Sequence, residues 1–520
     1  MIGLLIQDNA YEQDIRELLM SFYPGETYAH EVKENIDFYV QTRLKDGEAV
    51  IGIWEKLENG EESAGAAVNA AGVEAKESAV AVEKQTDSNM SAPEGLEGWT
   101  LTAHFAGKAD LSDHSATKNV IKKLFYQMLV GRTGHELPWG SLTGIRPTKI
   151  ALSRLEDGWK EDDIRRFMKE TYMTSDEKIN LSVEIAAREK RLMEPINYDS
   201  GYSLYVGIPF CPTTCLYCSF TSYPISKWKG RTGLYLEALF KELEYTAEKM
   251  KGRPLDTIYF GGGTPTSLPA EDIDAILCKL EQLFDIKNVL EFTVEAGRPD
   301  SITEEKLKVL ASHGISRISI NPQTMNQKTL DLIGRRHTVE NVKEKFHMAR
   351  ALGFDNINMD LIMGLPGEDL DDVKHTLEEI EALKPDSLTV HSLAIKRAAR
   401  LNMFKEEYAD LKISNTPEMI ALSEACARRM GMEPYYLYRQ KNMAGNFENV
   451  GYSLPGKACL YNILIMEELA TIVACGAGTT TKVVFPSENR RERCENVKEV
   501  EQYISRIDEM IGRKEKILNE

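Results

Sequence analysis

The sequence predicts an α/β fold in which a parallel sheet curls into a full or partial barrel, between a small α+β domain and a C-terminal extension. From Tyr202 onward, six strand-like runs alternate with helical stretches of ten or more residues. Strands in such a series form a parallel sheet with right-handed crossovers. The first hundred residues and those after about Leu401 lack this rhythm. The chain of 520 residues also exceeds the size of one hydrophobic core, so several domains are expected.

Residues 1–195 are predicted to form the N-terminal α+β domain. It contains the strand-like runs IDFYVQTRL, AVIGIWEKL and WTLTAHF, and one amphipathic helix over Tyr11–Tyr23. From about residue 58 to 95 the sequence is mainly Ala, Gly, Ser and Glu, with too little apolar surface to offset the entropy of ordering. A disordered loop is therefore predicted there. Further helices are expected over Lys118–Val130, Glu161–Tyr172 and Ser175–Met193.

Residues 196–400 are predicted to form the barrel, and residues 401–520 a C-terminal extension on the substrate side. The predicted strands are Tyr202–Ile208, Thr257–Phe260, Leu290–Glu295, Arg317–Ile320, Asn356–Leu361 and Ser387–His391. The extension should contain helices near Thr416–Met430 and Val497–Ile511, and a half-buried strand at Tyr435–Tyr438. In folds of this class, the chemistry lies at the C-terminal ends of the strands.

Composition and charge indicate which classes of partner are excluded and which cellular compartment is expected. Lys and Arg number 63 against 81 Asp and Glu, a net charge of −18 that repels nucleic-acid phosphates and anionic membranes. No stretch approaches 18 uninterrupted apolar residues, and the N-terminus lacks the basic lead of a secretion signal. Three of the eight cysteines fall within eight residues, a pattern typical of a metal site in a reducing cytosol. We therefore expect a cytoplasmic protein.

The three clustered cysteines, Cys211, Cys215 and Cys218, follow the first barrel strand in a C-x3-C-x2-C spacing. Three thiolates can ligate three irons of a [4Fe-4S] cubane and leave the fourth iron open. A structural zinc site would instead need four ligands, but the loop continues with Ser219 and Phe220. The missing ligand favours a cluster whose open iron binds a substrate or cofactor.

Further candidate residues stand at or just beyond the ends of successive strands. The second strand runs into Gly261–Thr264, where residues without Cβ let the backbone approach a ligand closely. A glycine triplet alone is more often a tight turn. Glu295, Gln323, Arg335 and Asp360 follow the next strands, and each alone could be a solvated residue or a helix cap. As a set they suit a cofactor that carries hydroxyl, ammonium and carboxylate groups.

The cysteine spacing, with an aromatic residue before the last cysteine, resembles the signature of the radical S-adenosylmethionine superfamily. This resemblance implies a partial (β/α)6 barrel and a [4Fe-4S] cluster that binds and cleaves S-adenosylmethionine to a 5′-deoxyadenosyl radical. With GGGTPT, RISINPQ and DLIMGLPGE, the part from Tyr202 to Leu401 resembles oxygen-independent coproporphyrinogen III oxidase, also called coproporphyrinogen dehydrogenase. The segment Tyr435–Tyr452 and the extra N-terminal domain resemble the HemZ-type branch of that family.

The resemblance also implies a site and a reaction. Contacts to the cluster-bound S-adenosylmethionine are implied for Tyr205, Tyr217, Gly262 and Glu295, with Tyr205 and Glu295 as the catalytic residues. Contacts to a second S-adenosylmethionine are implied for Gly263, Thr264, Gln323, Arg335, Asp360 and Ala394. The implied reaction is the oxidative decarboxylation of two propionates of coproporphyrinogen III to vinyl groups, which gives protoporphyrinogen IX. The implied electron source is a flavodoxin- or ferredoxin-type reductant.

Two positions depart from the family pattern and keep an alternative open. Phe220 stands where the dehydrogenases have a fourth cysteine, as in the related haem chaperones, and Gly207 replaces the histidine of His-Ile-Pro-Phe-Cys. A haem-binding chaperone is therefore the alternative function. Radical modification of RNA is a third hypothesis, which the acidic balance and the lack of a basic stripe disfavour.

Overall fold

A computed structural model describes residues 1–519 apart from 34, 57–93, 221, 397, 405, 407, 409–410 and 441–446. The chain forms two compact units. The first comprises Met1–Ile145 and Arg154–Val183, and the second comprises Arg146–Ser153 and Glu184–Glu520. The loop predicted to be disordered lies almost entirely on 57–93, outside the described residues.

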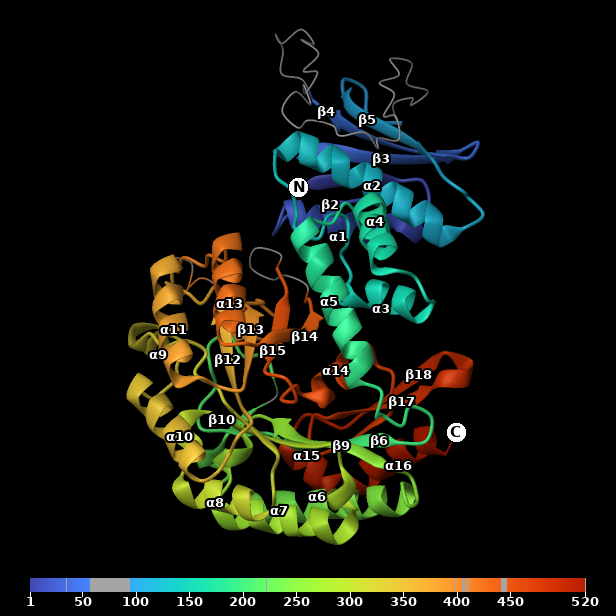
Figure 1. The fold of residues 1–520 in the computed structure, drawn as a ribbon. Coiled ribbons are helices and arrows are strands. Elements are labelled where there is room, and N and C mark those ends of the chain that lie inside the picture. Colours follow the sequence, from blue (N-terminus) through green and yellow to red (C-terminus); the bar gives the residue numbers. More distant parts are fainter. Residues whose placement is uncertain are drawn as a thin grey trace. The chain divides into compact units, whose positions relative to one another are not determined.

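The first unit is a five-stranded sheet in the order β2-β1-β3-β4-β5, with two helices on one face (Figure 1). Strands β2, β1 and β3 are parallel, and β3, β4 and β5 are antiparallel. Apolar side chains of α1 and α2 share a buried core with alternate residues of the strands, as the 3.6-residue and two-residue periodicities require. The bounds are β1 Ile2–Ile6, α1 Glu12–Phe22, β2 Tyr28–Ala29, β3 Phe38–Lys45, β4 Glu48–Glu55, β5 Thr100–Lys108 and α2 His114–Thr133.

Three helices follow in the sequence. Their bounds are α3 Thr148–Glu156, α4 Glu161–Tyr172 and α5 Asp176–Leu192. The predictions for the helices at α1, α2, α4 and α5 are confirmed to within a few residues.

The second unit is built on an eleven-stranded sheet in the order β14-β15-β13-β12-β11-β10-β9-β6-β16-β17-β18. The strands from β13 to β16 in this order are parallel, and the two outer pairs are antiparallel. The parallel strands are β6 Tyr202–Ile208, β9 Leu255–Gly262, β10 Glu291–Gly297, β11 Arg317–Ile320, β12 Ile357–Met363, β13 Ser387–Ser392 and β16 Ile472–Cys475. The edge strands are β14 Glu433–Tyr438, β15 Asn449–Ser453, β17 Thr480–Phe485 and β18 Arg490–Glu495.

All six strands predicted for the barrel are present, and the sheet extends beyond them at both edges. Strands from the predicted C-terminal extension pair with β13 on one side and with β6 on the other. β16 adds a seventh parallel strand directly beside β6. Residues 401–520 therefore share a sheet with the barrel strands. Among the described residues, the sheet ends at β14 and β18 and does not close.

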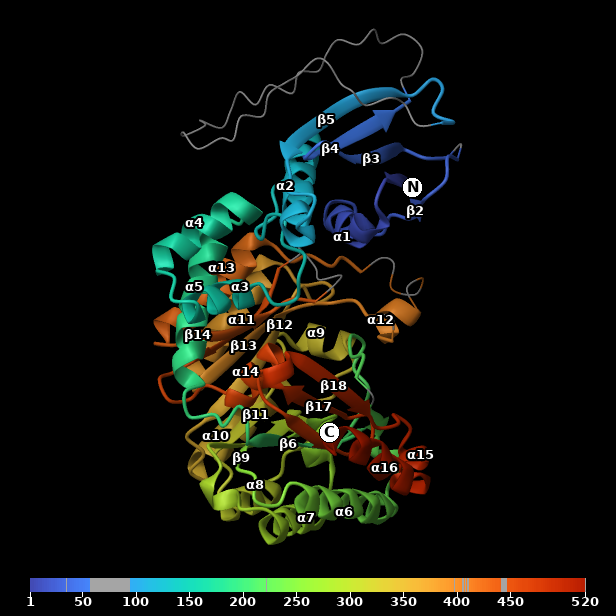
Figure 2. The same ribbon diagram turned by 90° about the vertical axis from the view of Figure 1, so that its right-hand side faces the viewer.

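Helices line the outside of this sheet. Figure 1 shows α6, α7, α8 and α10 following one another around it, and Figure 2 shows α15 and α16 beside β17 and β18. The predicted helix at 497–511 is two helices, α15 and α16. The bounds are α6 Thr232–Lys249, α7 Ala270–Leu283, α8 Glu304–Ser312, α9 Gln327–Leu332, α10 Val339–Ala351, α11 Leu370–Leu383, α12 Arg400–Met403, α13 Pro417–Arg429, α14 Leu460–Glu467, α15 Val500–Ser505 and α16 Ile507–Leu518.

The two faces of the parallel sheet differ in polarity. The register places Ser203 opposite Thr257 and Tyr205 opposite Tyr259, and the next strands continue this face with Glu291, Thr293, Glu295, Arg317, Ser319, Asn358 and Asp360. The alternate residues are apolar and buried: Leu204, Val206, Ile258, Phe260, Phe292, Val294, Ile318 and Met359. Because strand side chains alternate between faces, the outer face packs as core and the inner face is polar. The inner face is therefore suited to a polar ligand.

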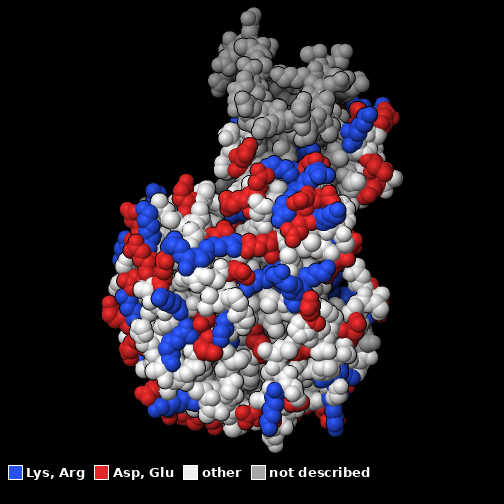
Figure 3. Space-filling model, viewed as in Figure 1, with Lys and Arg blue, Asp and Glu red and all other residues white. Residues whose placement is uncertain are grey.

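The surface carries both signs of charge. On the face drawn in Figure 3, Lys and Arg side chains are interspersed with Asp and Glu over the second unit. In the described part of the chain, no helix is both long enough and apolar enough to cross a bilayer.

Candidate functional site

The cysteine loop begins where β6 ends and is tied to the glycine segment that ends β9. The Gly263 N–H donates to the Ile208 carbonyl at 2.7 Å, and the Thr264 N–H donates to the Phe210 carbonyl at 2.7 Å. A Cβ at Gly263 would lie 2.5 Å from the Phe210 oxygen, so the close approach requires glycine. The loop and the glycine segment therefore form one structure, and both of these N–H groups are already used within it.

The donor set of the loop consists of the three free cysteines Cys211, Cys215 and Cys218. Three thiolates can each hold one iron of a cubane and leave the fourth iron open. A structural zinc ion would instead need a fourth protein ligand. The three cysteines therefore fit a [4Fe-4S] cluster better than a structural zinc ion.

Burial favours the protonated thiols of Cys211 and Cys218 when no metal is bound. It raises the pKa of Cys211, whose sulfur lies 3.4 Å from the Thr264 hydroxyl, and it raises the pKa of Cys218 to about 11. A cluster binds thiolates, so its assembly must displace these protons.

A buried guanidinium faces the middle cysteine. Arg298 Nη1 donates to Cys215 Sγ at 3.6 Å and to the Thr213 hydroxyl at 2.8 Å. The other edge of the Arg298 guanidinium forms a paired ion bridge with Asp300, with distances of 2.9 and 2.6 Å. Hydrogen bonds to ligand sulfurs tune the reduction potential of iron–sulfur clusters. Sequence reasoning missed Arg298, although it stands three residues after Glu295 at the same strand end.

A second buried guanidinium, that of Arg335, lies against the cysteine loop. Arg335 Nη2 donates to the Tyr217 hydroxyl at 3.3 Å, and Nη1 donates to the Asn321 carbonyl. His337 is fully buried nearby with its Nδ1 3.9 Å from Asp300, and neither ring nitrogen has a hydrogen-bond partner. Burial and the two guanidiniums lower the pKa of His337 to about 3. Its ring is therefore neutral, and the positive charge beside the cysteines belongs to the arginines.

Glu295 lies on the polar face within a cluster of stacked tyrosines. The Tyr259 hydroxyl donates to Glu295 Oε1 at 2.6 Å. The ring of Tyr259 stacks at 4.4 Å on Tyr461 of α14, and both rings stack with Tyr205. Burial raises the pKa of Glu295 to about 7, with a further increase from Asp360, whereas the Tyr259 hydrogen bond and Arg317 lower it. Two of the predicted site residues, Tyr205 and Glu295, thus meet in one cluster.

We expect the buried Glu295 carboxyl to make the protein without bound cofactor less stable as the pH rises. Its pKa in the folded chain is about 7 against an ordinary value of 4.5. Below the ordinary value both the folded and the unfolded carboxyl are protonated, and between the two values only the folded one keeps its proton. Stability is therefore lost through that window, by an amount on the order of 3 kcal/mol.

Urea unfolding of the wild-type chain and of Glu295→Gln between pH 4 and 8 measures this loss. As the pH rises, the free energy of unfolding of the wild type should fall by that amount relative to the free energy of unfolding of Glu295→Gln. Glu271→Gln, which replaces an exposed carboxylate, is the control. Its free energy of unfolding should differ from that of the wild type by the same amount at every pH. A constant difference for Glu295→Gln would contradict the assignment.

Gln323 and Asp360 are joined through the backbone. The Gln323 N–H donates to the Asp360 carbonyl at 2.9 Å, and Gln323 has a left-handed backbone with φ of 70°. Such strain in a residue other than glycine often marks a functional site. Asp360 accepts from the Asn358 amide at 2.7 Å, and its other oxygen lies 4.0 Å from His391. Ala394 follows the end of β13 by two residues and is half-buried.

Gly207 has no room for the histidine of the family pattern. A Cβ there would lie 2.3 Å from the methyl group of Thr479, in the turn between β16 and β17. Gly476 of the same turn has φ of 115°, and a Cβ there would lie 2.4 Å from the Gly207 carbonyl. The added strand β16 brings this turn against β6. The histidine is thus absent because the C-terminal part of the chain fills its place.

Phe220, at the position of the fourth cysteine, points to solvent. Its exposed fraction is 71%, and Lys396 Nζ lies 5.7 Å from the centre of its ring.

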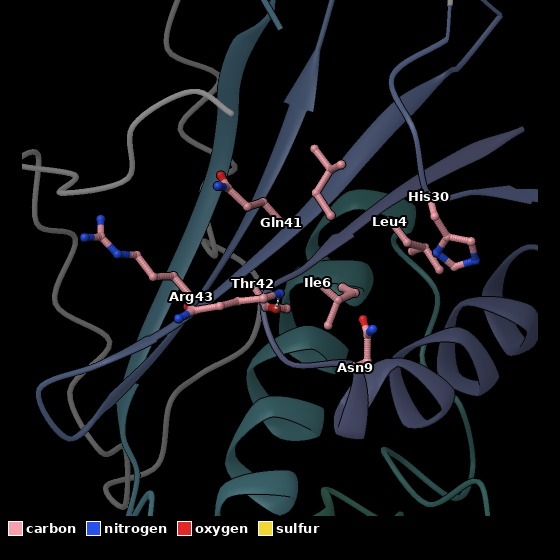
Figure 4. A pocket seen from close by; sticks show the side chains of 9 residues that line it. Leu4, Ile6, Asn9, His30, Gln41, Thr42 and Arg43 are labelled. Carbon is pink, nitrogen blue, oxygen red and sulfur yellow. Dashed lines mark hydrogen bonds between the residues drawn. The ribbon is translucent and has the colours of Figure 1, made fainter. Parts of the chain in front are cut away.

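The first unit contains a separate cavity of about 480 Å³ beside β1 and β3. Figure 4 shows side chains from both strands around it, together with Asn9 and His30. The Gln7 N–H donates to the Thr42 hydroxyl at 3.2 Å at its edge. Its lining is Leu4, Leu5, Ile6, Gln7, Asn9, His30, Gln41, Thr42 and Arg43. This lining contains no thiol or carboxylate, so it does not suit the chemistry of the cysteine loop.

Comparison with known proteins places this architecture in a family. The model of the radical SAM superfamily matches residues 205–380. The oxygen-independent coproporphyrinogen-III oxidase-like protein HemZ of Bacillus subtilis (strain 168) is 42% identical over 447 residues, which cover 84% of this chain and 89% of HemZ. The heme chaperone HemW of the same organism is 38% identical over 195 residues, 37% of this chain and 51% of HemW, so the match spans about half of that relative.

A solved structure is also similar. Coproporphyrinogen III oxidase (HemN) from Escherichia coli aligns with a TM-score of 0.49 and 23% sequence identity, over 60% of this chain and 70% of that chain. Members of the radical SAM superfamily bind a [4Fe-4S] cluster and S-adenosylmethionine. The extent of the match to HemZ, over nearly the full length of both proteins, shows that this chain belongs to the radical SAM superfamily and, within it, to the family of HemZ.

Proposed function

We propose that this chain is a radical enzyme of porphyrin biosynthesis that converts two propionates of coproporphyrinogen III to vinyl groups without oxygen. The observation that carries the proposal is the loop of Cys211, Cys215 and Cys218 at the C-terminal edge of a sheet with a polar inner face. The names of the relatives support the substrate: HemZ is described as coproporphyrinogen-III oxidase-like, and a 28% identical Escherichia coli relative is an oxygen-independent coproporphyrinogen III oxidase.

In this proposal the cysteine loop holds the cluster, which cleaves S-adenosylmethionine to the radical that takes a hydrogen atom from the β-carbon of a propionate. Arg298 holds the Cys215 sulfur and stabilises the electron-rich state of the loop. The carboxyl of Glu295, set by Tyr259, accepts hydrogen bonds from the polar groups of the cofactor. The stacked rings of Tyr205, Tyr259 and Tyr461 keep water from this side.

The remaining predicted residues fit two roles in the proposal. Tyr217 and Gly262 lie on the cysteine loop and the glycine segment, where the first S-adenosylmethionine would bind. The residues expected to bind a second S-adenosylmethionine lie on the glycine segment and near the adjoining strand ends: Gly263, Thr264, Gln323, Arg335, Asp360 and Ala394. Each propionate also loses one electron and carbon dioxide, and the electron leaves to an acceptor outside the chain. A cytoplasmic flavodoxin or ferredoxin would supply the reducing electron.

Anaerobic turnover tests the proposal. The reconstituted chain is incubated with S-adenosylmethionine, a strong reductant and coproporphyrinogen III, and the products are followed by mass spectrometry. We expect 5′-deoxyadenosine in proportion to substrate, and a tetrapyrrole that has lost two carboxyl groups. Cleavage of S-adenosylmethionine with unchanged coproporphyrinogen would overturn the substrate assignment and keep the radical site.

One observation favours a second candidate, a haem-binding chaperone. Phe220 stands at the position of the fourth cysteine and is exposed, and HemW is similar to 37% of this chain. In this alternative an exposed aromatic ring beside the loop would stack on a haem. Addition of haemin distinguishes the two functions. A chaperone would give a stable Soret band that Phe220→Ala weakens, whereas an enzyme would bind haem weakly.

A further inference from the structure

A second group of metal-ligating side chains lies on the outer helices, away from the cysteine loop. Asp274, Cys278 and Glu281 stand at spacings of four and three residues on α7, which brings them to one helix face. His313 follows the last residue of α8. One ligand atom each from Asp274, Cys278 and His313 lies within 4.8 Å of the other two. In the described part of the chain, this is the only such group.

We propose that Asp274, Cys278 and His313 form a binding site for a divalent transition-metal ion of the zinc class, with water in the fourth position. Thiolate, imidazole nitrogen and carboxylate are the three ligand types that zinc takes in proteins. A mixed set of this kind excludes magnesium and calcium, which prefer oxygen ligands only. Three protein ligands with one open position differ from the closed four-ligand geometry of a purely structural site.

The hydrogen bonds prepare the imidazole for this role. His313 Nδ1 lies 2.7 Å from Glu281 Oε1, and His313 Nε2 lies 3.0 Å from Asp274 Oδ1. A carboxylate on one ring nitrogen fixes the tautomer and directs the other nitrogen to the metal, which is the usual arrangement around metal-binding histidines. Glu281 therefore orients His313, and Asp274 marks the place where the metal binds.

The same contacts indicate which protons a metal ion must displace when it binds. Desolvation and the carboxylates of Asp274 and Glu281 raise the pKa of Cys278, so a bound metal ion must displace the thiol proton. The hydrogen bonds to the two carboxylates raise the pKa of His313. The metal ion replaces the thiol proton of Cys278 and any proton on His313 Nε2, and every displaced proton leaves to solvent.

The location separates this site from the cluster. Cys278 is exposed, whereas the other seven cysteines are half-buried or buried. The side chain of His313 is only 9% exposed, so the metal would lie at the junction of α7 and α8 and link the two helices. Nothing in the proposed radical reaction uses these residues, so the site stands or falls independently of that function.

Equilibrium dialysis of the reconstituted full-length chain against Zn²⁺ tests the proposal first, because the cluster then occupies Cys211, Cys215 and Cys218. We expect one zinc per chain in addition to the cluster iron. Cys278→Ser and His313→Gln should each remove that zinc. Glu281→Gln should weaken its binding by about 10–100-fold, the usual effect of losing an orienting partner. Cys494→Ser is the matched control, since it removes a cysteine outside the site, and it should keep the zinc.

Cobalt gives a second readout that identifies the ligands. In the full-length variant lacking all three cluster cysteines, Co²⁺ should show a thiolate-to-cobalt absorption band and the strong visible absorption of a tetrahedral ion. Cys278→Ser should abolish the thiolate band in this background. Zinc content that is the same in wild-type, Cys278→Ser and His313→Gln chains, or a cobalt spectrum without the thiolate band, would overturn the proposal. The four side chains would then be an ion-paired contact between α7 and α8.

Discussion

Cys215→Ala is expected to abolish assembly of the cluster, and with it every cleavage of S-adenosylmethionine. Cys215 is the buried middle cysteine of the loop, and Arg298 donates to its sulfur. Without this thiolate only two cysteines of the loop remain, and an iron of the cubane loses its protein ligand. Iron and sulfide content after reconstitution, the visible absorption of the cluster and the yield of 5′-deoxyadenosine should all fall to background.

Cys494→Ala provides the matched control for this prediction. Cys494 is a buried cysteine of β18, outside the loop, and its loss should leave iron content and cofactor cleavage unchanged. Circular dichroism of both variants should match that of the wild type, because the loop is a small part of the fold. Substantial iron binding and 5′-deoxyadenosine formation by Cys215→Ala would contradict the assignment of the cluster to this loop.

The barrel strands could be predicted because each one is a short apolar run between helices with clear periodicity. The alternation of strand-like runs with helical stretches predicts six strands, and all six are present: β6, β9, β10, β11, β12 and β13. The seventh parallel strand, β16, has only the four residues Ile472–Cys475, and its partner β6 lies more than 250 residues earlier. Its place in the sheet depends on tertiary pairing, which local periodicity does not encode.

The edge strand β14 also shows what a local sequence pattern cannot predict. The tyrosine run from Tyr435 to Tyr438 does form a strand, β14, as predicted. It was expected to be half-buried, but Tyr435, Tyr436 and Leu437 are buried. Helix α14 covers the run, and the Tyr435 hydroxyl accepts a hydrogen bond from Asn462 of that helix at 3.3 Å. The sequence pattern of a strand does not reveal which element will cover its second face.

Some residues of the candidate site could be predicted from the sequence, and others could not. The cysteine loop could be predicted from its spacing, and Glu295 and Asp360 from their places at strand ends. Arg298 and His337 could not, because a lone arginine and a lone histidine carry no pattern of their own. Their importance follows from Asp300, which pairs with Arg298 and lies 3.9 Å from His337 behind the loop. The absence of a histidine at Gly207 was visible in the sequence, but its cause, Thr479, is visible only in three dimensions.

Lys514→Met is expected to destabilise the protein by about 3–5 kcal/mol, because it leaves a buried carboxylate without its counter-ion. Lys514 Nζ on α16 donates to Glu242 Oε1 on α6 and to the Ala474 carbonyl on β16, each at 2.7 Å. The side chains are 1% and 0% exposed. The remaining donors to Glu242 are Asn496, Tyr503 and the Gly476 N–H, which hydrogen-bond the carboxylate but carry no charge.

A neighbouring ion pair on the same two helices is the matched control. Lys241 of α6 pairs with Asp508 of α16 at 2.5 Å, with side chains 51% and 80% exposed. Exposed pairs of this kind contribute between zero and about 1 kcal/mol, so Lys241→Met should cost no more than that. Unfolding in urea measures both. The double variant Glu242→Gln with Lys514→Met should recover most of the loss, since it removes the unpaired charge and keeps hydrogen-bonding groups.

Loss of the buried ion pair between Lys514 and Glu242 should also affect the cysteine loop. Glu242 accepts from Gly476, the residue that packs against Gly207 at the end of β6, and the cysteines begin four residues later. Lys514→Met should therefore release iron from the reconstituted chain faster than Lys241→Met does at the same concentration of chelator. If both variants lose iron and stability equally, the buried pair does not support β16 against β6. If Lys514→Met loses stability but not iron, β6 holds the loop without help from the C-terminal part of the chain.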